Sequence, residues 1–427
     1  MYLEKLNYKK ILLVVGFVLI CLALLFLIYW MFFRSAEPQP GEPGYVEPGI
    51  TGQLPEVGGG FNAGQLGSGG QLPQTGNLPQ TGSGGETVTQ EPDSVARGNA
   101  TYVLPLSADK TVGVALSPNK QGVVYYDKDS SQFYRLSADG KEKLLLSDEK
   151  FFAVESVVWS TDSTQAIMTF PDGIKVYYNF ATKKKTTLPK EVKEPVFNAA
   201  GSEIAFKYEG ANAENNFVAI ANPDGNKVKY IEDLGEEGNK VQTIFSPKEE
   251  VVAFYAKPSG LNSSEVFFIG QEGENYKSLK TQGTHFKALW APSGEKIIYQ
   301  IVSQDTNYNP SLWLADARGD NIGNNNIALK LDTWVDKCIF ASANEIYCAV
   351  PRNLTQGSGL YPELSYEGGD DIYRVDLSTG QTRLLALPVE QNGNADFKIS
   401  HLSLAGDGRN LFFWNENNEQ IYSLRLK

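Results

Sequence analysis

The chain contains two histidines, His285 and His401. Imidazole is well suited to metal binding and to proton transfer near neutral pH. Each histidine precedes the end of a short apolar strand, at Trp290 or Leu404, by a few positions. A metal site needs several converging ligands, and no cysteine lies near either histidine in the sequence. We therefore expect neither a metal site nor a cofactor, and we interpret both histidines as packed or solvated residues.

Other polar residues lie at similar positions, shortly before the ends of strands of the same kind. Paired carboxylates at such positions could act as general acid and base. Each belongs to a different strand, however, and sequence spacing defines no distance between them. The chain also lacks a G-x-S-x-G nucleophile motif. We predict no catalytic residue, and a solvated polar channel lined by Glu155, Glu194, Gln242, His285, Lys287, Asp336 and His401.

Two cysteines, Cys338 and Cys348, flank a predicted hairpin in the stretch DKCIFASANEIYCAV. Their midpoint falls in the turn Ala341–Asn344, so a symmetric hairpin places them opposite each other. Facing residues of antiparallel strands have Cα atoms about 4.5–5.5 Å apart, within the about 4.4–6.8 Å that disulfides span. We predict a disulfide between them. Two buried free thiols are the alternative, and zinc binding is disfavoured because no further ligand lies nearby.

A long insertion, Pro351–Gly369, joins two predicted strands of one repeat. Loops of this length are often functional, and exposed aromatic and leucine side chains on a loop are typical of a contact patch. These side chains could equally fold back over the neighbouring strands or the channel mouth. The candidate partner-binding residues are Leu354, Leu360, Tyr361, Leu364 and Tyr366.

The candidate residues above all belong to a repeated unit. This unit is clearest at Ala288–Gln300, with the sequence ALWAPSGEKIIYQ. An apolar strand ends on an aromatic residue, a small polar turn follows, and a second apolar strand runs back. The copies end their first strands 38 to 64 residues apart and follow strand periodicity. A repeat of about 40–45 residues with four strands is typical of a β-propeller blade. The strand-ending residues are Leu116, Trp159, Phe197, Phe245, Trp290, Phe340 and Leu404.

The pattern W/F-S/A-P-x-G-x-x-I-A-F/Y in these copies resembles the repeat of the TolB and WD40-like (PD40-type) β-propeller family, from near residue 100 to the end of the chain. The resemblance implies an all-β, seven-bladed propeller over residues 99–427. It also implies a protein-binding platform, although some propellers of this kind are attached to peptidase domains. The last copy is one strand short. We expect Thr101–Leu106 to complete it by pairing with Ile421–Leu426, because a closed ring leaves no open edge.

The N-terminal region is expected to anchor the chain in a membrane. Ile11–Phe33 is apolar and uncharged, and it is long enough for a hydrocarbon core of about 30 Å. The preceding lysines place residues 1–10 in the cytoplasm, and the length of the apolar run disfavours a cleaved signal peptide. Residues 34–98 are rich in Gly, Pro and Gln, which predicts a disordered linker. Its two LPQTG segments resemble a sortase signal but lack that signal's C-terminal context.

The net charge of −12 argues against nucleic-acid binding, which requires a basic surface. We expect a single-pass cell-membrane protein whose extracytoplasmic propeller binds a protein or cell-envelope partner. We expect it not to be an enzyme and to use no cofactor. Two alternatives stay open: a hydrolase or lyase that uses the propeller channel, and a structural subunit of an envelope assembly.

Overall fold

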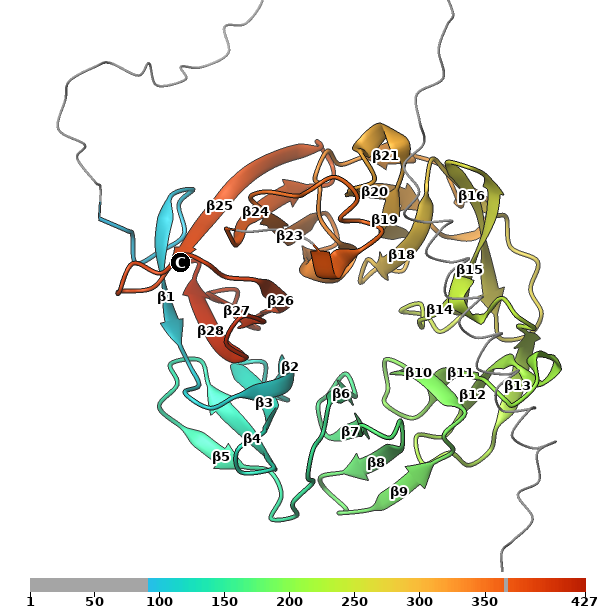
Figure 1. The fold of residues 1–427 in the computed structure, drawn as a ribbon, viewed down its shortest axis with the longest axis horizontal. Helices are drawn as coiled ribbons and strands as arrows, with labels where there is room; N and C mark the ends of the chain where they lie inside the picture. The colour runs from blue at the N-terminus through green and yellow to red at the C-terminus, as the bar shows by residue number, and fades with distance from the viewer. Residues whose placement is uncertain (1–90, 365–367) are drawn as a thin grey trace, which may run out of the picture. The chain divides into compact units, whose positions relative to one another are not determined.

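The structure is a computed structural model and describes residues 91–364 and 368–427. This part of the chain is almost entirely β, with short 3-10 helices between strands, which confirms the all-β prediction. Five sheets have four strands each, and their order in space equals their order in the chain. Together with one eight-stranded sheet they follow one another around a central opening (Figure 1). The fold is therefore a β-propeller.

The four-stranded sheets are antiparallel meanders joined by short turns. The first two contain β2 (Thr111–Leu116), β3 (Gly122–Asp127), β4 (Gln132–Ser137), β5 (Lys143–Leu145), β6 (Ser156–Trp159), β7 (Gln165–Thr169), β8 (Lys175–Asn179) and β9 (Lys185–Leu188). The next two contain β10 (Val192–Phe197), β11 (Ile204–Tyr208), β12 (Phe217–Ala221), β13 (Lys229–Asp233), β14 (Val241–Thr243), β15 (Val251–Gly260), β16 (Ser263–Gly270) and β17 (Leu279–Thr281). The fifth contains β18 (Thr284–Trp290), β19 (Lys296–Val302), β20 (Pro310–Asp316) and β21 (Ile327–Ala328). The 3-10 helices are η1 (Ala213–Asn215), η2 (Gly238–Lys240), η3 (Gln304–Thr306), η4 (Gly319–Asn321), η5 (Val335–Lys337) and η6 (Pro362–Leu364).

The eight-stranded sheet joins the C-terminal strands to the first described strand. In spatial order it contains β22 (Cys338–Ser342), β23 (Glu345–Pro351), β24 (Asp370–Asp376), β25 (Gln381–Val389), β1 (Ala100–Pro105), β28 (Gln420–Arg425), β27 (Asn410–Asn415) and β26 (Ile399–Leu404). Strand β1 pairs antiparallel with β28, with Val103 opposite Leu424, which confirms the predicted closure. It also pairs in parallel with β25, with Ala100 opposite Leu387, and the sequence pattern did not predict this second pairing.

Residues 91–98, which the sequence assigned to a linker, pack against the propeller. Ala96 is buried, and its N–H donates to the carbonyl oxygen of Arg425 at 2.9 Å. The Gly98 N–H donates to the carbonyl oxygen of Leu385 at 2.9 Å. These bonds hold the chain against β25 and β28, the two strands between which β1 lies. The predicted membrane span Ile11–Phe33 and the linker up to residue 90 lie outside the described residues. Within the described ranges, no helix combines the length and apolarity that a membrane crossing requires.

The hydrophobic core lies between neighbouring sheets. Middle strands have neighbouring sheets on both faces and are the most buried, and β3 is buried along its whole length. In one such interface Ile167 and Tyr177 of one sheet pack with Phe206 and Ala219 of the next. The recurring strand-ending aromatic residue fills the same kind of space, because the ring of Trp290 is buried and stacks on Phe254 with centroids 5.5 Å apart.

Candidate functional site

A cavity of about 520 Å³, the channel cavity, lies among the innermost strands, and a few charged and amide side chains stand out in its largely apolar lining. Strands β6, β10, β14 and β18 and the short helix η5 contribute its lining. Four of the predicted channel residues line it: Glu194, Gln242, Lys287 and Asp336. Residues far apart in sequence thus meet because every repeat presents the same strand to the centre.

The other three predicted channel residues lie elsewhere. His401 lines a second cavity of about 400 Å³, together with residues of β2 and β6. Glu155 and His285 are exposed and belong to neither of these two cavities. The sequence therefore placed seven side chains in one channel, whereas the structure divides them.

Four innermost strands, β2, β10, β18 and β26, contain a β-bulge that sequence reasoning missed. In each, two residues oppose one on the neighbouring strand. The first of the two has a positive φ and the second is buried. Bulges re-aim side chains and are frequent next to functional sites. The positive-φ residues are Gly113 (63°), Glu194 (46°), His285 (55°) and His401 (50°).

Three of these four residues are not glycine, and a non-glycine residue in this conformation costs about 1–3 kcal/mol. Such strain persists where the surrounding structure imposes it, and it is concentrated at functional sites. The available sequence signal was an apolar or proline residue directly after each, namely Pro195, Phe286 and Leu402, and the structure buries all three. That pair of residues interrupts the alternation expected of a regular strand.

Lys207 holds the carboxylate of Glu194. The lysine side chain is buried, and its Nζ lies 2.8 Å from Glu194 Oε1. The same ammonium donates to the carbonyl oxygens of Gly238 at 3.0 Å and Val241 at 3.3 Å. Its three donors are therefore all used, and the pair presents an oriented carboxylate at the cavity wall.

Gln242 lines the cavity, but its side chain also connects two strands. Its Nε2 donates to the carbonyl oxygen of Ala288 at 3.0 Å, and its Oε1 accepts from the Ala288 N–H at 2.8 Å. The side-chain amide thus imitates a strand neighbour and joins β14 to β18. Both ends of the amide are occupied, so Gln242 shapes the cavity.

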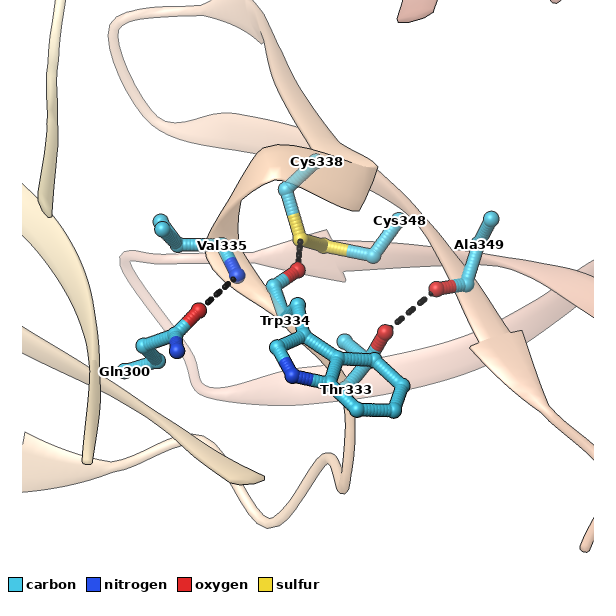
Figure 2. Close-up of a disulfide and its surroundings, with 7 residues drawn as sticks. All are labelled: Gln300, Thr333, Trp334, Val335, Cys338, Cys348 and Ala349. Carbon is cyan, nitrogen blue, oxygen red and sulfur yellow. Dashed lines mark hydrogen bonds between the residues drawn. A yellow bond between two sulfur atoms is a disulfide. The ribbon is translucent and has the colours of Figure 1, made fainter. Parts of the chain in front are cut away.

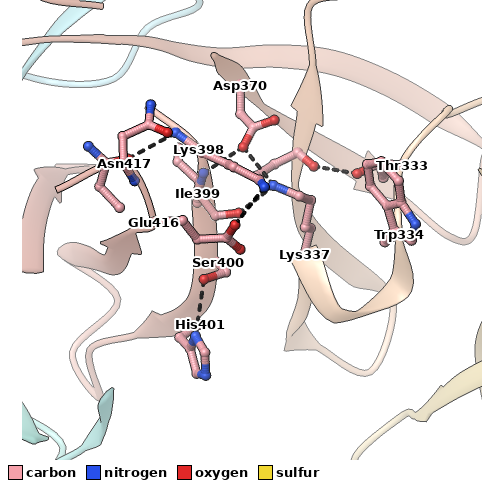
Figure 3. A network of polar contacts seen from close by, with 12 residues as sticks. Thr333, Trp334, Lys337, Asp370, Lys398, Ile399, Ser400, His401, Glu416 and Asn417 are labelled. Carbon is pink, nitrogen blue, oxygen red and sulfur yellow. Dashed lines mark hydrogen bonds and ion pairs between the residues drawn. The ribbon is translucent and has the colours of Figure 1, made fainter. Parts of the chain in front are cut away.

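The helix η5, which carries Asp336, is fixed from several sides (Figures 2 and 3). The Val335 N–H donates to Gln300 Oε1 at 2.9 Å. Buried Lys337 donates to Asp370 Oδ2 at 2.8 Å and to the carbonyl oxygen of Ile399 at 2.6 Å. Burial raises the pKa of Asp370, and the Lys337 ammonium opposes this rise. These bonds leave the exposed Asp336 on a rigid support beside the channel cavity.

The imidazole of His401 lies beside this network (Figure 3). Its Nδ1 is 3.1 Å from Ser400 Oγ, and its ring meets the Trp414 ring edge-on at 5.7 Å. Crowding by the surrounding strands limits hydration and lowers the pKa of His401, while the charges of Asp336 and Glu416 oppose this shift. The pKa of His285 is also lowered, because neighbouring atoms displace part of the water around its otherwise exposed ring. Both imidazoles are therefore favoured in the neutral form, which can accept a proton.

The predicted cysteine pair is joined at the start of this region (Figure 2). Cys338 and Cys348 face each other across β22 and β23, with Cα atoms 4.1 Å apart and a disulfide between them. Both residues are buried, and Cys338 also lines the channel cavity.

The insertion after β23 is partly packed and partly exposed. The Gly357 and Gly359 N–H groups donate to the carbonyl oxygens of Asn307 and Tyr308 at 3.0 and 2.9 Å, which fixes the loop on the preceding sheet. Leu354 and Leu360 are half-buried, whereas Tyr361 is 57% exposed. The side chain of Leu364 and all of Tyr366 lie outside the described residues.

In the described ranges no group of three or more His, Cys, Asp or Glu residues is arranged to hold a metal ion. The available chemistry is that of separate carboxylates, imidazoles and amines. Glu194 and Asp336 line one cavity with Lys287, and His401 lies near Asp336. This arrangement can bind polar groups and transfer protons.

Comparisons with known proteins concern the fold. No protein-family model matches this chain, and no curated protein matches it either. An oligogalacturonate lyase from Vibrio parahaemolyticus is 10% identical with a TM-score of 0.47, covering 76% of this chain and 93% of the lyase. The tricorn protease is also 10% identical to this chain, with a TM-score of 0.47. The match covers 76% of this chain and 34% of the protease chain. An oligogalacturonate lyase in complex with manganese is 13% identical with a TM-score of 0.37, covering 75% of this chain and 77% of its own.

The similar structures are enzymes, which contradicts the prediction that this chain is not an enzyme. That prediction treated the absence of a local nucleophile motif as a sign of no catalysis. A propeller can instead bring polar residues from separate repeats into one cavity, as it does with Glu194 and Asp336. At this identity, neither a reaction nor the role of any residue carries over.

Proposed function

We propose that this propeller binds a small polar ligand in the channel cavity and acts on it as a hydrolase or lyase. The observation that carries the proposal is that Glu194, Lys287 and Asp336 line one cavity of about 520 Å³. Ligand sites typically measure about 300–1,000 Å³ and contain a few well-placed polar groups. In the described part of the chain Lys287 has no ion-pair partner, so it is free to bind an anionic group of the ligand.

The chemistry follows from the two carboxylates. Lys207 holds the carboxyl group of Glu194 in a fixed position, which suits a general base. Asp336 is exposed, lies near the imidazole of His401, and supplies a second proton-transfer group. General acid and base groups of this kind assist proton transfer, and glycoside hydrolysis uses two carboxyl groups that flank the bond to be broken. A ligand with hydroxyl groups and one anionic group matches this set of side chains.

The test compares an acidic oligosaccharide with its neutral counterpart. We expect calorimetry to detect binding of the acidic ligand, and Glu194→Gln and Asp336→Asn to abolish any product measured as new reducing ends or unsaturated sugar. Glu155→Gln is the matched control, because Glu155 is exposed and outside the channel cavity. Equal binding and turnover in all three variants would contradict the proposal.

We further propose a seven-bladed ring that is anchored to a membrane. Counting the eight-stranded sheet as two blades joined by β1 makes a seven-bladed ring, in keeping with the TolB-like repeat. Ile11–Phe33 would anchor this ring to the cell membrane, with residues 1–10 in the cytoplasm and the propeller outside. Protease added to spheroplasts should then cut the linker, and protection of the linker would contradict this topology.

Partner binding through the insertion is a second candidate function, favoured by the exposed ring of Tyr361. Exposed aromatic residues often dominate protein interfaces. A Tyr361→Ser variant should keep its thermal stability and lose any envelope protein that the wild-type chain captures. Unchanged capture would remove this candidate.

A further inference from the structure

A groove of about 500 Å³ is lined by residues of β13, β15 and β16 and of the segments that follow β13 and β16. Strand β13 belongs to one sheet, and β15 and β16 belong to the next sheet around the ring (Figure 1). We call it the rim groove. Ile231 and Leu234 come from one sheet, and Tyr255, Phe267 and Ile269 come from the next. Phe267 is 36% exposed, and its ring stacks on Tyr255 with centroids 6.0 Å apart. The floor is therefore apolar and open to solvent, and no residue of the channel cavity contributes to it.

Two strand edges border this groove. Strand β17 pairs with β16 only at Ser264–Val266, yet β16 continues to Gly270. In Phe267–Gly270, alternate N–H and C=O groups therefore point away from β15 without a strand partner in the described ranges. Strand β13 pairs only with β12 there, which leaves its other edge open as well. Open edges of this kind accept an added strand from another chain.

The groove is acidic. Glu232, Asp233 and Glu274 line it, and none of them has an ion-pair partner among the described residues. Glu237 also lines it but is paired with Lys240. Lys257 is the one basic residue in the lining. Carboxylates around an apolar floor attract lysine or arginine side chains and select against acidic segments.

We propose that the rim groove binds an extended peptide segment of a partner protein, in which apolar and basic side chains alternate, as an added strand. Alternation places the apolar side chains on the floor formed by Phe267 and Ile231 and turns the basic ones toward Glu232 and Glu274. A second copy of this chain is a poor occupant, because it would bring the same carboxylates together. Its net charge of −12 adds to that repulsion.

The test uses the full chain and a fluorescein-labelled peptide of alternating Lys and Val or Phe. We expect fluorescence anisotropy to show saturable binding that weakens with added salt. A peptide with Glu in place of each Lys, and one with Pro in place of alternate Lys residues, should bind at least about tenfold more weakly. The double variant Glu232→Lys/Glu274→Lys should weaken binding of the Lys peptide by about tenfold or more.

A charge-matched control separates the groove from the overall charge. Asp129→Lys/Glu142→Lys makes the same charge change on exposed residues of another sheet and should leave binding within about twofold of the wild type. Equal weakening by both double variants, equal binding of the Glu peptide, or no binding of the Lys peptide would overturn the proposal. A dimer that forms through the groove and is lost in Glu232→Lys would also overturn it, in favour of a second copy.

Discussion

Single side chains in and around the channel cavity divide into those that stabilise the fold and those that face the cavity. The Lys207 ammonium bonds two backbone carbonyl oxygens and the carboxylate of Glu194. The Gln242 amide bonds the backbone carbonyl oxygen and N–H of Ala288. Glu194, Lys287 and Asp336 keep exposed polar ends in the cavity. The two groups should therefore respond differently to substitution.

Lys207→Met should destabilise the protein more than Glu194→Gln. The first variant leaves the carbonyl oxygens of Gly238 and Val241 without their buried donor, which costs about 1–3 kcal/mol. The second alters a pair whose carboxylate side chain is 61% exposed, which is worth about 1 kcal/mol or less. Urea unfolding of both variants measures the difference. Equal losses would show that the lysine acts mainly through Glu194.

The histidines predict a pH dependence of stability. The pKa of His401 and that of His285 are lowered from 6.5 in the folded state, because neighbouring strands displace part of the water around each ring. As pH falls through 6.5 the unfolded chain binds protons first, so the free energy of unfolding decreases toward acid. Unfolding measured between about pH 5.5 and about pH 7.5 should show this trend, above the range where most carboxylates titrate. A His285→Gln/His401→Gln variant should lose part of it, and an unchanged slope would contradict the assignment.

The disulfide is a prediction for the oxidised protein. Cys338 and Cys348 enclose a short loop, so the bond should contribute about 2–3 kcal/mol to stability. Mass spectrometry without reduction should find the two cysteines linked in protein produced under oxidising conditions. Two thiols open to alkylation would remove the bond.

At the scale of elements, the bulges decide which side chains point toward the centre. Strand β2 carries Gly113 at the bulge position where β10, β18 and β26 carry Glu or His. A Cβ on Gly113 would lie 2.4 Å from the Cβ of Val157 on β6. The close approach of two innermost strands therefore requires glycine at this bulge.

Gly113→Ala should cost more stability than Gly173→Ala. Both glycines have positive φ, 63° and 78°, but a Cβ on Gly173 would meet nothing within 4 Å. Gly173→Ala therefore carries only the backbone cost of about 1–2 kcal/mol, whereas Gly113→Ala adds overpacking of about 1–3 kcal/mol. Thermal unfolding of the two variants compares them. Similar melting temperatures would mean that β2 and β6 can move apart without cost.

At the scale of the whole molecule, β1 closes the structure by joining β25 to β28. Thr101 is fully buried and Val103 is 4% exposed within the joint. The first described strand thus holds the last one in place, and the stability of the sheet depends on both ends of the propeller.

A chain that starts at residue 91 should stay folded, and one that starts at residue 109 should not stay soluble. The shorter chain loses β1 and with it the buried side chains of Val103 and Leu106, each worth about 1.5–3 kcal/mol. It also exposes the edges of β25 and β28, which favours aggregation. Thermal melting and size-exclusion chromatography measure both effects. Equal behaviour of the two chains would show that the sheet does not need β1.

The amino-acid sequence by itself determined the all-β fold, the repeat and the pairing of β1 with β28. These follow from local signals: strand alternation, a recurring aromatic residue and turn pairs such as Asp139-Gly140, where Gly140 has a φ of 71°. The cysteine pairing was also predictable, because hairpin register relates positions only ten residues apart.

Only the tertiary structure decided which polar residues share a cavity. His401 and Glu194 have equivalent bulge positions but line different cavities, because the packing of neighbouring sheets sets where the inner strands separate. Three further features are contacts between distant segments. They are the hydrogen bond from Lys207 to Gly238 of η2, the parallel pairing of β1 with β25, and the bonds from Gly357 and Gly359 to Asn307 and Tyr308. Sequence periodicity describes one strand and its hairpin partner, whereas these contacts depend on the distance between separate sheets.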